Sequence, residues 1–482
     1  MRIDQLDRGD HSLRRDAQRS HTRLSARRMA AVCVALVVCA ASCGGGKEIE
    51  SSGGGGGAST TVPTADAKCA TAKPEATDVG VTADTITIAV IADTGSSIRP
   101  GLFQGSVDGV KAWAAYKNAN GGLGCRQVVV KDYDSKLSPS DAKNAVLSAC
   151  TDAFVMVGTT ATFLNDVTPL EQCPDKTGAI TGLPDLALLQ TEPAHQCSAI
   201  SFVVLPTVGS CPYSGTGDRT FQVSSGPFRY YLDKVSPDLH GVWVIPKDLP
   251  STISSSMPGF RASQEMGIKL DAEVGASGLD TQSAYTSIAQ LIKDKGSTYG
   301  RNGLDYKGTV FLRKEAQIQG VDTVKVWDCS VQCYDQRLIT EGGDAVEGQY
   351  VWLSFLPFED KGSNPTLDNF LEYDAKPDGF GAQAFAAGEL LGSVIDGIVA
   401  ADGPNGITRK AILTGLQNTH SFDAGGFIPP VDIGAKKGSV CYAMVQVKDG
   451  KFVRVNPTAP GTFDCTGTAE SITLDPAAAF KG

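Results

Sequence analysis

The sequence lacks a surplus of basic residues. Its 482 residues contain 43 Lys and Arg against 53 Asp and Glu, which gives a formal net charge of −10. Nucleic-acid binding needs a positive surface that neutralises phosphates, so this charge argues against a nucleic-acid partner. It also argues against attraction to an anionic membrane surface. Hydrophobic residues make up 41% of the chain, which argues against disorder throughout.

Motifs of the common catalytic sites are also absent. The sequence contains no Gly-x-Ser-x-Gly, no His-Glu-x-x-His and no Gly-x-x-x-x-Gly-Lys-Ser/Thr. Only three histidines follow residue 42, and we interpret His195, His240 and His420 as structural or surface residues. Asp132 and Asp134 form a carboxylate pair of the kind a glycosidase uses, but a turn-and-cap role is the preferred interpretation. We therefore expect a binding protein, not an enzyme, with no cofactor and no metal.

The only long uncharged run near the amino terminus spans 29–42. It is too short to cross a bilayer, which takes about 20 residues, but it fits the apolar core of a secretory signal. The run ends in Ala-Ala-Ser followed by Cys43, which resembles the lipobox of bacterial lipoproteins. We expect residues 1–42 to be a signal peptide and Cys43 to be a lipid anchor on the extracytoplasmic face of a bacterial cell membrane. The alternative is an ordinary cleaved signal in which Cys43 is a plain thiol.

Residues 43–78 are rich in Gly, Ser and Thr, with five consecutive glycines at 53–57. Such a segment cannot bury enough apolar surface to order itself. We expect it to be a flexible tether between the anchor and a folded body.

The thirteen cysteines fit an exported protein. Removing two with the signal and Cys43 to lipid leaves ten, an even number that predicts up to five disulfides. No Cys-x-x-Cys motif is present, so disulfides are a better interpretation than a metal site. The sequence alone leaves the pairing open.

Beyond residue 85 short apolar strands alternate with helices, which predicts an α/β fold with parallel sheets flanked by helices. The strands are expected at 86–91, 126–131, 153–157, 179–181, 241–245, 268–274, 309–312, 324–327 and 349–355, with a terminal hairpin at 438–447 and 451–455. The helices are expected at 103–119, 138–150, directly after 158–161, and at 226–235, 257–266, 283–295, 333–341, 366–374, 380–401 and 408–416. These are too many strands for one sheet, so we expect two lobes.

Ligands of open parallel sheets bind beyond the carboxyl ends of the strands. Three polar, glycine-containing loops are expected there, at 93–99, 158–162 and 181–183. The second is expected to expose backbone N–H groups at the amino end of a helix, which favours a carboxylate or another anion. Turn formation alone would also explain each loop taken singly.

The segment 86–166 resembles the amino-terminal lobe of type I periplasmic binding proteins, in particular the branched-chain amino acid/amide group that serves ABC importers. The matching motifs are Asn-Ala-Asn-Gly-Gly-Leu-Gly at 118–124, Lys-Asp-Tyr-Asp at 131–134, Ser-Pro-Ser-Asp-Ala at 138–142 and Val-Met-Val-Gly at 155–158. The resemblance continues more loosely to about residue 455. It implies a two-lobed fold with three hinge crossings. The first lobe would hold 79–222 and 356–428, the second would hold 223–355 and 429–470, and 471–482 would be a tail.

The resemblance also implies which residues bind the ligand between the lobes. The first lobe would contribute Ser96, Ser97, Thr160, Thr162, Thr181 and Gly182. The second lobe would contribute residues near Lys247 and Asp248, together with Arg313 and Asp328. Asp328 is the candidate for holding a ligand ammonium, with a strand-capping carboxylate as the equal alternative.

The implied fold suggests five disulfides and a function. The pairs are Cys69–Cys125, Cys150–Cys173, Cys197–Cys211, Cys329–Cys333 and Cys441–Cys465. The function is that of a monomeric extracytoplasmic lipoprotein that closes on a small polar ligand, such as an amino acid, an amide or a related acid, and delivers it to an ABC permease. It would contact the membrane only through its lipid. The alternative is a ligand-sensing receptor ectodomain of the same fold, coupled to a signalling partner.

Overall fold

The computed structural model describes Cys69 and residues 71–97, 99–205, 209–248, 250–476 and 478–480. The expected signal peptide, Cys43 and most of the expected tether lie outside the described residues. The last residues assigned to the tether are bound to the body. Thr77 donates a hydrogen bond to the carbonyl of Ile407, and the carbonyl of Glu75 accepts one from Arg126. The folded body therefore begins before residue 79.

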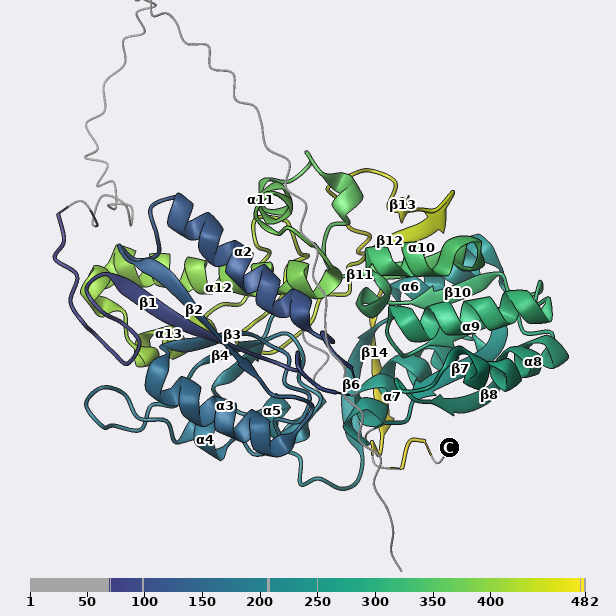
Figure 1. Cartoon of the computed structure of the whole chain (residues 1–482), viewed down its shortest axis with the longest axis horizontal. Coiled ribbons are helices and arrows are strands. Elements are labelled where there is room, and N and C mark those ends of the chain that lie inside the picture. The colour runs from purple at the N-terminus through teal and green to yellow at the C-terminus, as the bar shows by residue number, and fades with distance from the viewer. Residues whose placement is uncertain are drawn as a thin grey trace, which may run out of the picture. The chain divides into compact units, whose positions relative to one another are not determined.

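Lobe one is built on a parallel five-stranded sheet with the strand order β2-β1-β3-β4-β5 (Figure 1). The strands are β1 Thr85–Ala92, β2 Gln127–Asp134, β3 Val155–Thr159, β4 Asp185–Ala187 and β5 Ser201–Val203.

Both faces of this sheet are covered, as the continuous apolar run of β1 predicts. Ile88 and Val90 pack in one cluster with α2, whereas Ala89 and Ile91 pack on the other face with α3. The helices of lobe one are α2 Gln104–Ala119, α3 Pro139–Asp152, α4 Thr168–Glu171, α5 Pro193–Cys197, α11 Pro365–Tyr373, α12 Gly379–Asp402 and α13 Arg409–Gln417. By length and composition α12 could cross a membrane. However, most of its apolar stretch is buried inside the protein, and the helix packs along α2. We therefore interpret α12 as a core helix.

Lobe two is built on a seven-stranded sheet with the order β13-β12-β11-β10-β9-β7-β8. Its first five strands along the chain run parallel, and the terminal hairpin β12–β13 adds antiparallel strands at one edge. The strands are β7 His240–Pro246, β8 Lys269–Ala276, β9 Tyr299–Asn302, β10 Val326–Cys329, β11 Gln349–Leu353, β12 Ala443–Lys448 and β13 Lys451–Asn456.

Helices again cover both faces of this sheet. Trp243 and Ile245 of β7 pack with α7, whereas Val242 and Val244 pack with α8 and α9. The helices are α6 Gly226–Tyr230, which continues as a π-helix at Tyr231–Val235, α7 Pro250–Glu265, α8 Thr286–Lys295, α9 Tyr306–Gln319 and α10 Gln336–Gly342.

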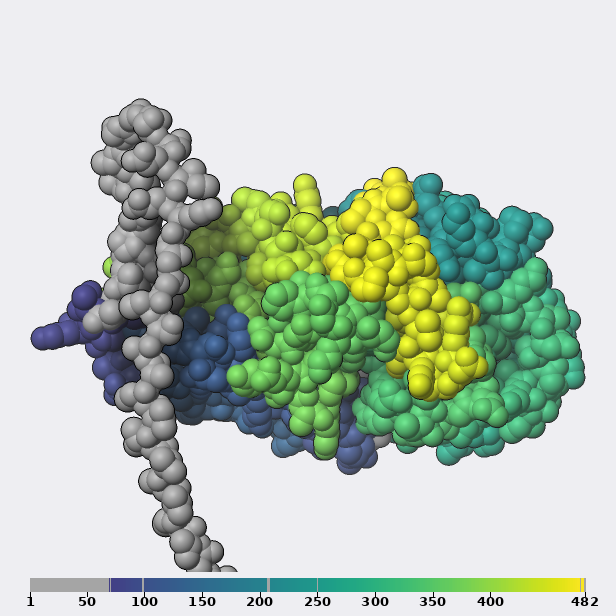
Figure 2. Space-filling view, turned by 90° about the horizontal axis from the view of Figure 1, so that it is seen from above, coloured from purple at the N-terminus to yellow at the C-terminus, as the bar shows by residue number. Residues whose placement is uncertain are grey.

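The chain passes between the two lobes three times: between β5 and β7, between β11 and α11, and between α13 and β12. A two-stranded antiparallel ribbon accompanies the first crossing, formed by β6 Arg219–Ser224 and β14 Ala469–Leu474. The segment expected to be a tail from residue 471 therefore begins inside a strand. Figure 2 shows the yellow C-terminal segment at the surface between the green and teal segments of the two lobes.

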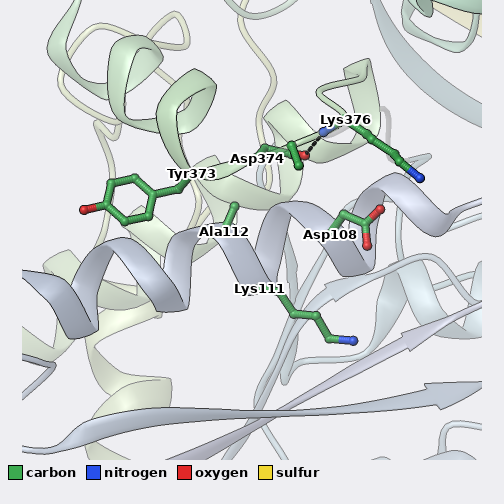
Figure 3. A pocket seen from close by; sticks show the side chains of 7 residues that line it. Asp108, Lys111, Ala112, Tyr373, Asp374 and Lys376 are labelled. Atoms are coloured by element: carbon green, nitrogen blue, oxygen red, sulfur yellow. Dashed lines mark hydrogen bonds between the residues drawn. The ribbon is translucent and has the colours of Figure 1, made fainter. Parts of the chain in front are cut away.

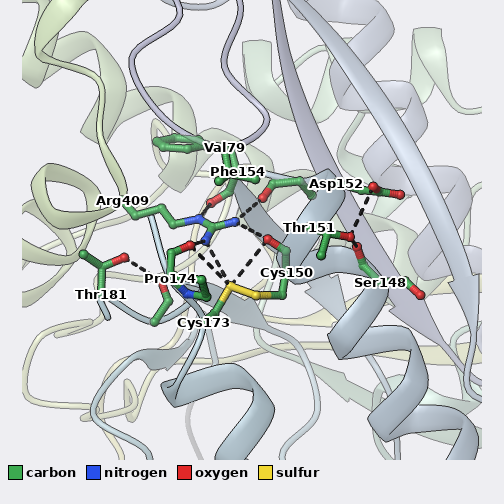
Figure 4. Close-up of a disulfide and its surroundings, with 12 residues drawn as sticks. Val79, Ser148, Cys150, Thr151, Asp152, Phe154, Cys173, Pro174, Thr181 and Arg409 are labelled. Carbon is green, nitrogen blue, oxygen red and sulfur yellow. Dashed lines mark hydrogen bonds between the residues drawn. A yellow bond between two sulfur atoms is a disulfide. The ribbon is translucent and has the colours of Figure 1, made fainter. Parts of the chain in front are cut away.

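Ten cysteines form five disulfides in the body, in the five pairings expected. Beside Cys150–Cys173 lies Arg409, whose guanidinium is fully buried (Figure 4). Arg409 donates hydrogen bonds to the carbonyls of Phe154 (3.2 Å), Pro174 (2.7 Å), Cys150 (2.9 Å) and Ala153 (2.6 Å). This arginine joins the start of α13 to the amino end of β3.

Two expected strands are wrong. The run 309–312 lies inside α9, which Asp305 caps and Gly320 ends, because a short buried apolar run fits a helix as well as a strand. The strand of that unit is β9. The run 179–181 is a loop in which Ile180 is 57% exposed, and the fourth strand is β4 instead.

Candidate functional site

The carboxyl ends of β1 and β3 lie next to each other in lobe one, because the two strands pair in parallel. Their loops bring together four of the predicted site residues. Ser96 is 4% exposed, Thr160 is fully buried and Thr162 is 3% exposed, whereas Ser97 is exposed. The Oγ1 atom of Thr160 is buried and has no hydrogen-bond partner among the described residues.

Two carboxylates hold these loops in place. Asp93 is fully buried and accepts hydrogen bonds from the Ser135 hydroxyl (2.7 Å) and from the N–H groups of Leu137 (2.7 Å) and Thr162 (2.9 Å). Asp134 accepts from the N–H of Thr94 at 3.1 Å. These contacts fix the course of the segment that carries Ser96, Ser97 and Arg99.

The pKa of Asp134 reflects that role. Burial raises its pKa, but hydrogen bonds from the backbone N–H groups of Gly95, Lys136 and Thr94 outweigh burial, and the pKa is lowered. The ionised carboxylate is therefore favoured, and in this form it accepts the hydrogen bonds of the loop.

The helix expected directly after Gly158 is wrong. A turn follows β3, and the next helix, α4, has only four residues and begins at Thr168. The N–H of Thr160 donates to the Ile91 carbonyl, and that of Thr162 donates to Asp93. The protein's own groups therefore occupy these two donors, which the sequence assigned to a ligand anion.

Thr181 and Gly182 lie at the other edge of the sheet. They precede β4, and both of their N–H groups donate to the carbonyl of Cys173. Figure 4 shows Thr181 in the same surroundings as Arg409, at the amino end of β3. The structure does not bring these two residues to Ser96 and Thr160. The residues that follow β4 at the carboxyl edge were missed, among them Thr191, whose hydroxyl donates to the Thr162 carbonyl.

The corresponding edge of lobe two carries Asp248, Asp280 and Asp305. Asp248 follows β7 and accepts from the N–H of Gly278 at 2.7 Å. Asp305 caps α9 by accepting from the N–H of Gly308 at 3.2 Å. With three carboxylates, this edge is acidic.

Arg99 of lobe one contacts this acidic edge. Its Nη2 donates to Oδ2 of Asp305, and its Nη1 donates to the carbonyl of Gly278 at 3.2 Å. The two side chains are 16% and 20% exposed. The loops at the carboxyl ends of the two sheets therefore touch each other through an ion pair that no local sequence pattern predicts.

The pKa of Tyr285 responds to Arg99 and to the three carboxylates of this edge. Burial raises the pKa of Tyr285, and the negative charges of Asp280, Asp305 and Asp248 raise it further, whereas Arg99 lowers it. Arg99 is thus the basic group from lobe one that offsets a cluster of lobe-two carboxylates.

Glu192 follows β4 in lobe one, and its pKa is affected by Ser251 of lobe two. Burial raises the pKa of Glu192, and the Ser251 hydroxyl at the start of α7 opposes that shift. The Ser251 Oγ atom is buried and forms no hydrogen bond with the described residues. We interpret the pair as a close approach of the two lobes.

Two predicted lobe-two site residues lie in the core instead of at this edge. Asp328 is 1% exposed and accepts hydrogen bonds from the hydroxyls of Tyr231 (2.9 Å) and Tyr299 (2.6 Å). Arg301 pairs with it at 3.4 Å. Burial raises the pKa of Asp328, and Arg301 opposes the shift. Asp328 is thus fully engaged within lobe two.

Arg313 lies within α9, not in a loop. It is 7% exposed, stacks its guanidinium 4.7 Å from the Trp327 ring and donates to the Glu347 carbonyl at 2.8 Å. Burial lowers its pKa to about 9. These contacts hold α9 on the sheet.

A cavity of about 380 Å³ lies on the helical side of lobe one, between α2 and the residues after α11 (Figure 3). Asp108 and Lys111 of α2 line it together with Tyr373, Asp374 and Lys376. Its lining includes no residue of lobe two, so a ligand there would not contact both lobes.

The described histidines are each engaged by a single aspartate. Each of the three histidines after residue 42 shares a hydrogen bond with an aspartate: His195 with Asp185, His240 with Asp271 and His420 with Asp432. Among the residues that the structure describes, no group of three His, Cys, Asp or Glu side chains is placed to hold a metal ion.

Residues 252–451 match the sequence model of the family described as periplasmic binding protein. A search of curated protein sequences finds no match.

Solved structures share the fold of the chain. An ABC transporter substrate-binding protein of Aeropyrum pernix is 13% identical, with a TM-score of 0.61, over 79% of this chain and 96% of that one. A leucine-binding protein of Thermotoga maritima is 18% identical, with a TM-score of 0.57, over 77% and 99%. A fatty acid ABC transporter substrate-binding protein of Thermomonospora curvata is 13% identical, with a TM-score of 0.59, over 83% and 96%.

Proposed function

We propose that this chain, a type I periplasmic binding protein by its fold and by the match of residues 252–451, is the solute-binding component of an ABC importer. The matched family consists of binding proteins, not enzymes. The ligand would be a small molecule held between the two lobes. Cys43 would anchor the protein to the extracytoplasmic face of the membrane, and a permease would accept the ligand.

The contact of Arg99 with Asp305 and Gly278 is the observation that carries this proposal. It connects loops from the carboxyl ends of two separate sheets, where ligands of parallel sheets bind. Contacts made by both lobes exist only when the lobes are together, so a ligand that adds such contacts shifts the hinge toward closure. A permease can then distinguish loaded from empty protein.

Polar groups of lobe one would hold the ligand. Ser96, Ser97, Thr160 and Thr162 lie together at the carboxyl edge, and the Thr160 hydroxyl is free to bond. Opposite them, Asp248 and Asp305 would meet a cationic or hydroxyl group. Two of the named solved structures are a leucine-binding protein and a fatty acid transporter's binding protein, which makes a carboxylate-bearing ligand the class to test first.

A thermal-shift screen of the purified protein tests the proposal, with amino acids, amides, short-chain and fatty acids, and sugars as candidates. A ligand at 100 times its Kd stabilises the native state by about 2.7 kcal/mol, which raises the Tm by several degrees. Small-angle X-ray scattering should show a smaller radius of gyration with the same compound. If no compound in these classes raises the Tm, the proposed function is wrong.

A further inference from the structure

A second cavity, of about 470 Å³, lies in lobe two beside the carboxyl end of β8. Its size is within the range of small-molecule sites. Its lining includes Lys247, Val274, Gly275, Asp280, Ile288 and Leu291, and no residue of lobe one. A ligand could therefore enter it without contacting lobe one, and the cavity shares Asp280 with the acidic edge of lobe two.

One wall of the cavity is apolar. Val274 comes from β8, and Ile288 and Leu291 come from neighbouring turns of α8, three residues apart on one helix face. Ile288 is 8% exposed and belongs to the lobe-two core, which holds the wall in place. This wall suits an aliphatic chain, because burying such a chain removes apolar surface from water.

The opposite side carries a lysine whose path is set by a glycine. A Cβ at Gly275 would lie 2.9 Å from Cδ and 3.3 Å from Cβ of Lys247, so the lysine stem runs directly over the glycine. No hydrogen bond or ion pair of the Lys247 ammonium is formed among the described residues. The ammonium therefore keeps its donors for an anion at the cavity.

Asp280 connects the cavity to the interlobe ion pair. Its Oδ2 accepts from the N–H of Ser277 at 2.8 Å, which closes a tight loop at 277–280. In that loop the carbonyl of Gly278 accepts from Arg99. A ligand that packs against this loop would hold the acceptor of Arg99 in place.

We propose that this cavity binds an aliphatic carboxylate, with the carboxylate on Lys247 and the chain along Val274, Ile288 and Leu291. The site is additional to the interlobe site and is coupled to it only through the 277–280 loop. The carboxylate could come from a fatty acid or from an apolar amino acid, whose ammonium would meet Asp280. Occupancy orders the 277–280 loop and favours the contact with Arg99.

Isothermal titration calorimetry of the purified protein tests the proposal, with octanoate, leucine and octylamine as probes. Octanoate should bind, and K247Q should weaken it about fivefold, as expected for a charged contact at a partly open site. K269Q, at the other end of β8 and also exposed, should bind octanoate like the wild type. Octylamine, which reverses the charge, should bind at least tenfold more weakly than octanoate.

Two further variants separate the sites and the sources. R99Q alters the interlobe contact and should leave most of the octanoate affinity, whereas A284W should block the cavity and abolish the affinity. Leucine that binds the wild type and is weakened by D280N identifies an amino acid source. Octanoate without leucine binding identifies a fatty acid source. Equal affinity of K247Q and K269Q, or equal binding of octylamine and octanoate, would overturn the proposal.

Discussion

Arg99 and Asp305 form an ion pair that joins lobe one to lobe two. The arginine follows the first strand of one sheet, and the aspartate caps the helix after the third parallel strand of the other sheet. The two residues are 206 positions apart, so their contact reports how the lobes meet. A change in this pair should alter the hinge equilibrium more than the stability of either lobe.

R99Q is expected to shift the hinge toward open forms. A partly exposed pair of this kind is worth about 1 kcal/mol, so the ratio of closed to open molecules should fall about fivefold. Single-molecule FRET between dyes on the two lobes measures this change.

D305N is the matched partner variant because Asn still accepts from Gly308 and keeps α9 capped. The double variant should open the hinge no more than R99Q alone. K143Q breaks an exposed pair with Asp166 inside lobe one and serves as the control. Additive effects of R99Q and D305N would contradict the interlobe role.

Thr159 and Thr160 are adjacent, but we expect different results from their replacement. The Thr159 hydroxyl donates to Asp185 at 2.6 Å, whereas the Thr160 hydroxyl has no partner among the described residues. T159V should therefore lower the free energy of unfolding by about 1–3 kcal/mol. T160V should leave stability unchanged and weaken the ligand found by the screen about fivefold, because it removes one hydrogen bond.

Urea unfolding and calorimetry distinguish the two threonines. A T160V protein that binds with wild-type affinity would show that this hydroxyl does not contact the ligand. A T160V protein that is destabilised like T159V would show that Thr160 has a structural partner instead.

Asp378 is expected to make stability depend on pH. Its carboxylate caps α12 by accepting from the N–H of Gly381 at 2.7 Å and packs against Gly105 of α2. The pKa of Asp378 is raised to about 6, chiefly by burial and also by the charges of Asp335 and Asp374, whereas the N–H of Gly381 and the charge of Arg337 oppose the shift. Folding therefore favours the protonated form of Asp378 more than the unfolded chain does.

The direction in which stability changes with pH follows from the difference between the native and unfolded pKa of Asp378. A carboxyl with a raised native pKa contributes stability that is full below its unfolded pKa of about 3.9 and is lost as pH rises through about 6. D378N keeps the cap and stays neutral, so at pH 7.5 it should be more stable than the wild type by up to about 3 kcal/mol. At pH 4 the two proteins should unfold at the same urea concentration. A difference that persists at pH 4 would assign the effect to packing instead.

Local sequence signals predicted most of the fold. Ser138, for example, caps α3 as expected, accepting from the N–H of Asp141. The run 309–312 misleads because it begins with the β-branched Thr309 and Val310 and continues with Phe311 and Leu312, a short mostly apolar run that suits a strand as well as a buried helix face. The helix signals were Asp305 before it and Gly320 after it, and these would have corrected the assignment.

The site was less predictable, for a physical reason. A loop after a strand shows which residues are polar but not which of them the loop itself uses. Asp93 takes up the N–H of Thr162, a donor assigned to a ligand, and the core tyrosines take up Asp328, the acid assigned to a ligand. The partner of Arg99 depends on how two lobes meet, which no local pattern contains.

R409M is expected to be the most destabilising of these changes. The guanidinium is fully buried and donates to four carbonyls at the junction of α13 with β3, and burial lowers its pKa. Methionine has a similar length but leaves those carbonyls without donors, so the loss should be about 3–5 kcal/mol. K410A, the exposed neighbour, should stay within about 0.5 kcal/mol of the wild type. Urea unfolding of both variants measures the difference, and a loss below about 1 kcal/mol for R409M would mean that water reaches these carbonyls.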